Sequence, residues 1–318
     1  MMKVLVPDKI EQKVIEVLKD AGFDVDFKPG ITVEDAIKIV GDVDAMIVRS
    51  GIKVNKAMLD AAPKLKLVVR AGVGYDNIDT QYAASLGVVV ENTPFGNTNA
   101  AAEHTLALLF LLAKKIFQGQ AELKGGTWNR KLEGTELKGK TLGVVGLGNV
   151  GKKVTKVALA LEMHVIGYDP YVDEKAMKEI GVTRATLEEI LKSADYITFH
   201  LPLNAETKNM ISNAQFALMK DGVRILNVAR GGVIDEGALE EAIKAGKVAG
   251  AALDVYEQEP PTCRSLIENA GVICTPHQGA STKEAQINVG LDAANQVIAA
   301  LKEHKIISCV NGVKALKN

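Results

Sequence analysis

The chain has 318 residues, of which 47% are hydrophobic and 24% are charged, and a chain of this length is expected to form two domains. A net charge of −1 and an aromatic content of 4% give no basis for binding nucleic acid or an anionic membrane. The N-terminus has no signal-peptide core and no apolar run reaches the roughly 18 residues of a membrane helix, so we expect a cytoplasmic protein.

Short apolar strands alternate with helices through the first half of the chain. Apolar residues at 10, 14, 15 and 18 have helical spacing, and the apolar run before them is typical of a strand. Such alternation predicts parallel strands in a doubly wound α/β domain. We expect strands at 3–7, 23–27, 45–49, 65–70 and 87–91, and helices at 10–18, 33–40 and 56–62.

The middle of the chain begins with a turn-rich junction at 93–98. A long helix is expected over 99–123, because its centre is rich in leucine. The polar loop 124–140 carries the only tryptophan, Trp128, and we interpret it as a candidate subunit arm.

The second half alternates in the same way and predicts a six-stranded dinucleotide-binding sheet. We expect strands at 142–145, 164–168, 195–199, 224–228, 249–253 and 271–274, and helices at 150–161, 173–179, 187–192, 213–219 and 236–245. A last helix, 282–303, follows a sheet that is already complete, so we expect it to return to the first domain. The first domain would then comprise 1–98 and 282–318, and the nucleotide domain 99–281.

The stretch 141–151 reads TLGVVGLGNVG, a strand that runs into the pattern G-x-G-x-x-G. Gly146 permits a tight turn, Gly148 lets the backbone approach a pyrophosphate, and Gly151 lets helix and strand pack closely. The phosphates would lie at the helix N-terminus, where free N–H groups favour anions. A second strand ends in Asp169, 18 positions after Gly151, which suits a carboxylate that binds a ribose 2′-hydroxyl. Because an acid there repels a 2′-phosphate, we expect NAD rather than NADP.

The five histidines differ in their surroundings. We expect His304 to be solvated and His164 to be structural, whereas His104 suits either helix packing or a site. His200 follows a strand and is a candidate for lining the cofactor site. His277 follows another strand between Pro276 and a run of small residues, which favours a functional imidazole.

Two further strand ends carry charged residues. Arg230 follows the strand at 224–228 on a glycine-rich turn, where its planar guanidinium could bind a carboxylate. Glu257 and Glu259 follow the strand at 249–253, and spacing alone does not choose between them. Cys263, Cys274 and Cys309 lack metal-ligand spacing, so we expect reduced thiols and no metal site.

These motifs together resemble the D-isomer-specific 2-hydroxyacid dehydrogenase family over essentially the full chain. The matching stretches are GLGNVG, NVARGGVIDEGAL, AALDVYEQEPP and TPHQGAS. The resemblance implies a Rossmann NAD-binding domain inserted into a flavodoxin-like substrate domain, a homodimer, and a catalytic trio of Arg230, Glu259 and His277. His277 would exchange the proton with the substrate oxygen, Glu259 would hold the other ring N–H and favour the imidazolium, and Arg230 would bind and polarise the 2-oxo acid.

The resemblance also implies two sets of binding residues. Cofactor contacts are expected at Val73, Gly146, Gly148, Asn149, Val150, Gly151, Asp169, His200, Leu201, Pro202, Val228, Ala229, Arg230, Asp254, His277, Gly279 and Ala280. Substrate contacts are expected at Arg49, Ser50, Gly72, Val73, Gly74, Asn97 and Arg130.

Within the family, the stretches around Arg49, Arg70 and Gly279 are most similar to enzymes that oxidise 3-phospho-D-glycerate in serine biosynthesis. Arg49 and Arg130 are therefore candidate phosphate ligands, Arg130 from a neighbouring subunit, although both also suit a solvated surface. Gln278 stands where many relatives carry an apolar residue, a departure that leaves the trio intact and that we expect to alter the nicotinamide side of the pocket. The longer relatives carry a C-terminal regulatory domain, which we do not expect here.

Two other functions fit the same sequence. A hydroxypyruvate or glyoxylate reductase would use the same trio without phosphate ligands. A NAD-responsive interaction protein would bind the cofactor with negligible turnover, but the chain has no evident docking insert.

Overall fold

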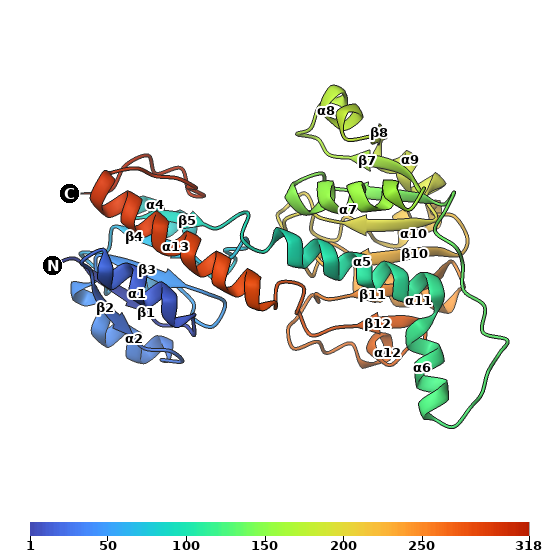
Figure 1. Ribbon diagram of the computed structural model, residues 1–318, viewed down its shortest axis with the longest axis horizontal. Helices are drawn as coiled ribbons and strands as arrows, with labels where there is room; N and C mark the ends of the chain where they lie inside the picture. Colours follow the sequence, from blue (N-terminus) through green and yellow to red (C-terminus); the bar gives the residue numbers. More distant parts are fainter. Residues whose placement is uncertain (318) are drawn as a thin grey trace. The chain divides into compact units, whose positions relative to one another are not determined.

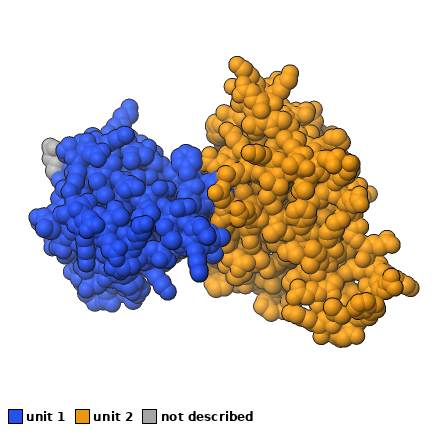
Figure 2. All heavy atoms as spheres, viewed as in Figure 1, with its two compact units in different colours: residues 1–98, 280–318 blue, residues 99–279 orange. Residues whose placement is uncertain are grey.

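The computed structural model describes residues 1–317 and divides into two compact units. The first comprises Met1–Thr98 with Ala280–Asn318, and the second comprises Asn99–Gly279 (Figure 2). Within the described residues, no helix has both the length and the apolar character needed to cross a membrane.

The first unit contains a five-stranded parallel sheet in the order β2-β1-β3-β4-β5 (Figure 1). The strands are β1 (Lys3–Val6), β2 (Asp24–Phe27), β3 (Ala45–Val48), β4 (Leu67–Arg70) and β5 (Val89–Asn92). This is the strand order of flavodoxin-like folds, which confirms the predicted fold class. The helices are α1 (Gln12–Asp20), α2 (Val33–Ile39), α3 (Lys56–Asp60), α4 (Thr80–Ser85) and α13 (Lys283–Glu303), with a 3-10 turn at Val40–Asp42.

Helix α13 packs beside α1 and contacts β3 and β4, although it begins more than 200 residues after each of them in the chain (Figure 1). Its buried apolar side chains share one core with those of α1 and the sheet. The two helices approach closely at Gly290, where a Cβ would lie 2.7 Å from Cγ2 of Val14. The hydroxyl of Thr282 caps the helix by accepting a hydrogen bond from the amide of Ala285.

The second unit contains a seven-stranded parallel sheet in the order β12-β11-β10-β9-β6-β7-β8. The strands are β6 (Thr141–Val145), β7 (His164–Tyr168), β8 (Thr183–Arg184), β9 (Tyr196–Phe199), β10 (Val223–Asn227), β11 (Val248–Leu253) and β12 (Val272–Cys274). The order reverses at β6, as in Rossmann folds. Six strands were expected; β8 is a seventh, and its two exposed residues show no apolar pattern.

The helices of this unit cover the sheet on both sides (Figure 1). They are α5 (Thr98–Lys114), α6 (Ile116–Lys124), α7 (Asn149–Ala160), α8 (Glu174–Glu179), α9 (Leu187–Ser193), α10 (Asn213–Leu218), α11 (Glu236–Lys244) and α12 (Arg264–Ile267). The prediction of one helix over 99–123 is wrong, because Lys115 has a φ of +51° and separates α5 from α6. A left-handed residue cannot continue an α-helix, and the leucine pattern of the segment gives no sign of the break.

Candidate functional site

His277 and Glu259 form a hydrogen-bonded pair at the carboxyl side of the second sheet. Nδ1 of His277 lies 2.6 Å from Oε2 of Glu259, and their side chains are 52% and 38% exposed. Because a carboxylate only accepts hydrogen bonds, Nδ1 carries the proton in this pair. The other ring nitrogen, Nε2, is then oriented for proton exchange with a ligand.

Glu257, the other glutamate of the same loop, makes a different contact. Its amide donates to Oε1 of Glu236 at 2.7 Å, and its own Oε1 accepts from the amide of Glu236 at 2.9 Å. These reciprocal bonds hold Glu257 at the start of α11. The structure therefore brings Glu259, and not Glu257, to the imidazole.

Asp254 holds the loop that carries the histidine. Its side chain is 1% exposed, and it accepts hydrogen bonds from the hydroxyl of Thr275 (2.6 Å) and the amides of Gln278 (2.8 Å) and Gly279 (2.7 Å). Burial opposes ionisation, but hydrogen bonds from His104, Thr275 and the two amides outweigh it and lower the pKa of Asp254. Asp254, which was expected to contact the cofactor, thus also fixes the position of the loop that carries His277.

Arg230 lies on a tightly held turn after β10. The buried Asn227 ends that strand, and its side chain donates to the carbonyl of Arg230 at 2.8 Å and accepts from the amide of Ala229 at 3.1 Å. A Cβ at Gly231 would lie 1.7 Å from the carbonyl oxygen of Tyr256, so only glycine allows the turn to pack against the segment after β11. The turn of Arg230 therefore contacts the segment that leads to Glu259.

The three fingerprint glycines have distinct surroundings. Gly146 has a φ of +97°, and its Cβ would lie 2.6 Å from the carbonyl oxygen of His200. A Cβ at Gly151 would lie 2.1 Å from the carbonyl oxygen of Gly146, whereas a Cβ at Gly148 would have nothing within 4 Å. Open space therefore adjoins the Gly148 cap of α7, where a helix N-terminus favours a phosphate.

Asp169 follows β7 and contacts the same glycine-rich turn. Its Oδ2 accepts a hydrogen bond from the amide of Leu147 at 2.8 Å, and its Oδ1 accepts one from the amide of Tyr171 at 2.9 Å. Each carboxylate oxygen retains a lone pair for a further donor. The carboxylate is thus oriented beside the turn on which a dinucleotide would lie.

His200 lies behind the glycine turn, with Nε2 3.1 Å from the hydroxyl of Thr198. Burial lowers the pKa of His200 to about 4. The ring is therefore neutral near pH 7 and adds no positive charge beside the turn. Among the other expected cofactor residues, Leu201 and Pro202 follow His200 directly, and Asn149 and Val150 form the first turn of α7.

Val228 and Gly279 lie against each other, since a Cβ at Gly279 would be 2.8 Å from Cγ1 of Val228. Ala280 is the first residue of the chain's return to the other unit, and its carbonyl accepts from the side chain of Gln286 at 2.9 Å. The expected cofactor residues of the second unit thus gather at the carboxyl ends of β6, β7, β9, β10, β11 and β12.

The first unit carries most of the expected substrate residues. Arg49 follows β3, with its amide bonded to Asp8 at 2.6 Å and Nη1 donating to the carbonyl of Lys9 at 3.2 Å. Its Nε is buried and has no hydrogen-bond partner within residues 1–317, and burial lowers the pKa of the guanidinium. Ser50 beside it is exposed, and Asn97, just before α5, is half-buried.

The turn 72–74 differs from the expectation in one detail. The amide of Gly72 already donates to the hydroxyl of Thr93 at 2.8 Å. The amides of Val73 and Gly74 therefore remain the candidate donors of this turn. Arg130 lies in the second unit, on the exposed loop after α6.

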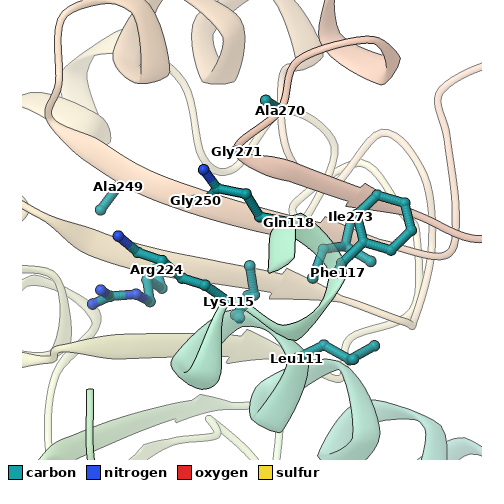
Figure 3. Close-up of a pocket in the computed structure, with 11 residues that line it drawn as sticks. Leu111, Lys115, Phe117, Gln118, Arg224, Ala249, Gly250, Ala270, Gly271 and Ile273 are labelled. Atoms are coloured by element: carbon teal, nitrogen blue, oxygen red, sulfur yellow. The ribbon is translucent and has the colours of Figure 1, made fainter. Parts of the chain in front are cut away.

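A separate cavity of about 140 Å³ lies at the opposite, amino end of the second sheet (Figure 3). It is lined by Arg224 and Lys115 on one side and by Phe117 and Ile273 on the other. None of the sequence-predicted site residues lines it.

Sequence reasoning missed two residues that support the site. Asn227 orders the Arg230 turn, and the hydroxyl of Tyr256 lies 3.0 Å from the carbonyl of Thr275. Both are polar side chains that are buried at or near the carboxyl end of an apolar strand. A polar residue at the carboxyl end of an apolar strand was the signal that could have identified them, because a buried polar group needs a hydrogen-bond partner.

Comparisons with known proteins agree with this geometry. Residues 106–279 match the family model described as D-isomer specific 2-hydroxyacid dehydrogenase, NAD binding domain. The chain is 47% identical to a D-3-phosphoglycerate dehydrogenase of Archaeoglobus fulgidus, over 98% of this chain and 59% of the relative. It is 44% identical to a D-3-phosphoglycerate dehydrogenase of Methanocaldococcus jannaschii, over 98% of this chain and 60% of the relative. The chain thus spans about 60% of the length of these relatives.

The structure is also similar to a crystal structure of a glyoxylate reductase from Paecilomyes thermophila. The TM-score is 0.90 at 29% identity, over 97% of this chain and 98% of that one. The family model covers more than half of the chain and includes the Rossmann sheet, the His277–Glu259 pair and Arg230. The chain belongs to the D-isomer specific 2-hydroxyacid dehydrogenase family, and residues 106–279 correspond to its NAD-binding domain.

Proposed function

We propose that the protein oxidises 3-phospho-D-glycerate to 3-phosphohydroxypyruvate with NAD, the first step of L-serine biosynthesis. The observation that carries the proposal is the 2.6 Å pair of His277 and Glu259 at the carboxyl end of a family-matched NAD-binding sheet. The names of the relatives at 44–47% identity support the choice of substrate.

The residues around the glycine turn fit a dinucleotide. Nothing lies within 4 Å of a Cβ built at Gly148, which leaves the start of α7 open to a pyrophosphate, and Asp169 bonds to the same turn through the amide of Leu147. A carboxylate here favours a ribose hydroxyl over a 2′-phosphate. Bound NAD would supply the hydride acceptor or donor, and the chain's own residues would supply binding, orientation and proton transfer.

In the proposed reaction, His277 exchanges one proton with the substrate oxygen at Nε2. It accepts the hydroxyl proton during oxidation and returns it to the carbonyl oxygen during reduction. Glu259 fixes the ring through Nδ1–H and stabilises the imidazolium that forms when the ring accepts the proton. Arg230 binds the carboxylate of the substrate and polarises its carbonyl.

Arg49 and Arg130 are the proposed ligands of the substrate phosphate. The buried Nε of Arg49 has no partner in the described chain, and an anion would satisfy it. Arg130 is exposed on the loop after α6, which suits contact with a ligand in a neighbouring subunit. Ser50, Asn97 and the amides of Val73 and Gly74 are further proposed contacts.

The second candidate function is a hydroxypyruvate or glyoxylate reductase. The fold similarity to the glyoxylate reductase of Paecilomyes thermophila favours it. This activity needs the trio but no phosphate ligand, so Arg49 distinguishes the two functions.

We also propose a homodimer that forms through α6 and the loop that follows it. Ile116, Phe117, Leu123 and Trp128 are 48–77% exposed on this segment. Large apolar side chains that gather on one surface are typical of a protein interface. The cavity beside Phe117 has cationic Arg224 and Lys115 on its wall, which would accept a carboxylate of the second copy (Figure 3).

The dimer is tested by the molar mass in solution. The wild type should have twice the chain mass of 33.9 kDa, and Phe117→Glu should be monomeric at micromolar concentration. Leu218→Glu, at a partly exposed leucine on α10, is the matched control and should remain dimeric. A monomeric wild type would contradict the proposal.

We further propose a cytoplasmic location, which three free cysteines support and cell fractionation would test.

The experiment that tests the function compares NADH oxidation with 3-phosphohydroxypyruvate, hydroxypyruvate and glyoxylate. We expect the highest kcat/KM with the phosphorylated acid, and we expect Arg49→Gln to lower that value alone. Equal or better use of the unphosphorylated acids would favour the reductase. Binding of NADH without turnover of any of the three would favour an interaction protein.

A further inference from the structure

A second imidazole, that of His104, lies behind the loop of His277. It projects from α5, and Nε2 lies 3.0 Å from the hydroxyl of Thr275 and 3.4 Å from Oδ1 of Asp254. The side chain is only 17% exposed. The neighbouring Ala102 and Thr105 are almost fully buried, so the helix is firmly packed at this point.

The hydrogen bonds of this group define which nitrogen carries the proton. The hydroxyl of Thr275 has one proton, and its 2.6 Å bond to the carboxylate of Asp254 uses it. The same oxygen must therefore accept from His104, whose Nε2 is the donor. The resulting chain runs from imidazole to hydroxyl to carboxylate and connects α5 to the loop after β12.

Separate contacts fix that loop on either side of His277. Asp254 accepts from the amides of Gln278 and Gly279, which come after His277, whereas the His104–Thr275 contact lies two residues before it. The carbonyl of Thr275 also accepts from the amide of His277 at 3.0 Å. Before His277, Thr275 is also held by its hydroxyl bond to Asp254 and by the hydroxyl of Tyr256, which donates to its carbonyl. The His104 contact comes from α5, so its loss would free that side of the loop from the helix and leave the Gly279 side held.

We propose that His104 is a positioning residue that sets the place of His277 through Thr275 and Asp254. The proposal rests on the proposed function, in which His277 transfers the proton. Proton transfer depends steeply on geometry, since a misplacement of about 1 Å can cost about 100-fold in rate. The effect should appear in kcat more than in cofactor affinity, because Asp254 still holds Gly279.

The test compares His104→Leu, which removes the donor, with His104→Gln, which retains an N–H at similar reach. We expect kcat to fall about tenfold in His104→Leu and to stay within about threefold of wild type in His104→Gln, as for loss and retention of one hydrogen bond to a buried charged network. KM for the 2-oxo acid and Kd for NADH should change less than about threefold in both. His164→Leu, at an exposed histidine on β7, is the matched control and should match the wild type.

Thr275 provides an independent pair if His104→Leu folds poorly. Thr275→Val should have a lowered kcat, and Thr275→Ser should have a kcat near that of wild type. The double variant His104→Leu/Thr275→Val should be no slower than Thr275→Val, because loss of the hydroxyl already removes the His104 contact together with the bond to Asp254. Any of three results would overturn the proposal. The kcat of His104→Leu could be within twofold of wild type, that of His104→Gln could be as low as that of His104→Leu, or that of Thr275→Val could equal that of Thr275→Ser. A wild type without turnover, or an active His277→Ala, would instead refute the proposed function.

Discussion

Two glycines of the turn after β6 should respond to alanine in opposite ways. In Gly151→Ala the new Cβ would lie 2.1 Å from the carbonyl oxygen of Gly146. That oxygen is part of the backbone, and the amide of Gly146 is bonded to the carbonyl of Tyr168 at 2.8 Å, so the strain cannot be relieved by a side-chain rotation. Overpacking costs about 1–3 kcal/mol, and we expect about 3 kcal/mol here because backbone must move. For a unit of this size, Tm should fall by about 6–12 °C.

Gly148→Ala should leave stability nearly unchanged and weaken NADH binding. Its φ of −69° and ψ of −163° are accessible to alanine, and nothing lies within 4 Å of the added carbon. We expect the free energy of unfolding to change by less than about 0.5 kcal/mol. The methyl group would occupy the space proposed for the pyrophosphate, so Kd for NADH should rise at least about tenfold, or about 1.4 kcal/mol.

Thermal unfolding and fluorescence titration with NADH measure the two effects on the same samples. The reasoning requires that Gly151→Ala loses stability and that Gly148→Ala loses affinity at an unchanged Tm. A Gly151→Ala variant with the wild-type Tm would refute the packing argument. Wild-type affinity in Gly148→Ala would refute the location of the pyrophosphate.

Three further predictions concern side chains of the same sheet. Because burial lowers the pKa of His200 from 6.5 to about 4, the neutral ring stabilises the fold above pH 6.5, and this contribution is lost as the pH falls from 6.5 to 4. Urea unfolding should show that the stability of wild type relative to His200→Gln drops by about 2.4 kcal/mol between pH 7 and pH 4.5, and a constant difference would show that the ring is not desolvated. Asp169→Ala should raise Kd for NADH about tenfold and spare NADPH, whereas equal losses for both would count against the ribose contact. Glu259→Gln should lower kcat about 10–100-fold with NADH affinity retained, and Glu257→Gln should not; equal kinetics of the two variants would show that the contact with His277 is not used.

The two sheets were predictable because buried parallel strands and amphipathic helices leave strong local patterns. The exceptions lack such patterns. Strand β8 has two exposed residues that pair with β7 at the edge of the sheet, and the left-handed Lys115 interrupts a segment that has apolar residues on both sides. Both features depend on tertiary contacts or on a single backbone angle, which periodicity does not report.

The positions of Arg230 and His277 at the end of the sheet were predictable because each lies three residues after an apolar strand. The choice of Glu259 over Glu257 came from family resemblance, and the structure supplies the physical reason: Glu257 is bonded to Glu236, 21 positions away. The role of His104 was left open for the same reason, since its partner Thr275 lies 171 positions away. Contacts of this kind exist only in the folded chain.

The most direct test of the proposed chemistry is turnover by His277→Ala, measured together with its affinity for NADH. We expect kcat to fall about 100- to 10,000-fold, as for loss of a general acid–base group, while Kd for NADH stays within about threefold of wild type. A variant that retains a tenth or more of the wild-type kcat would contradict the central claim that this imidazole transfers the proton.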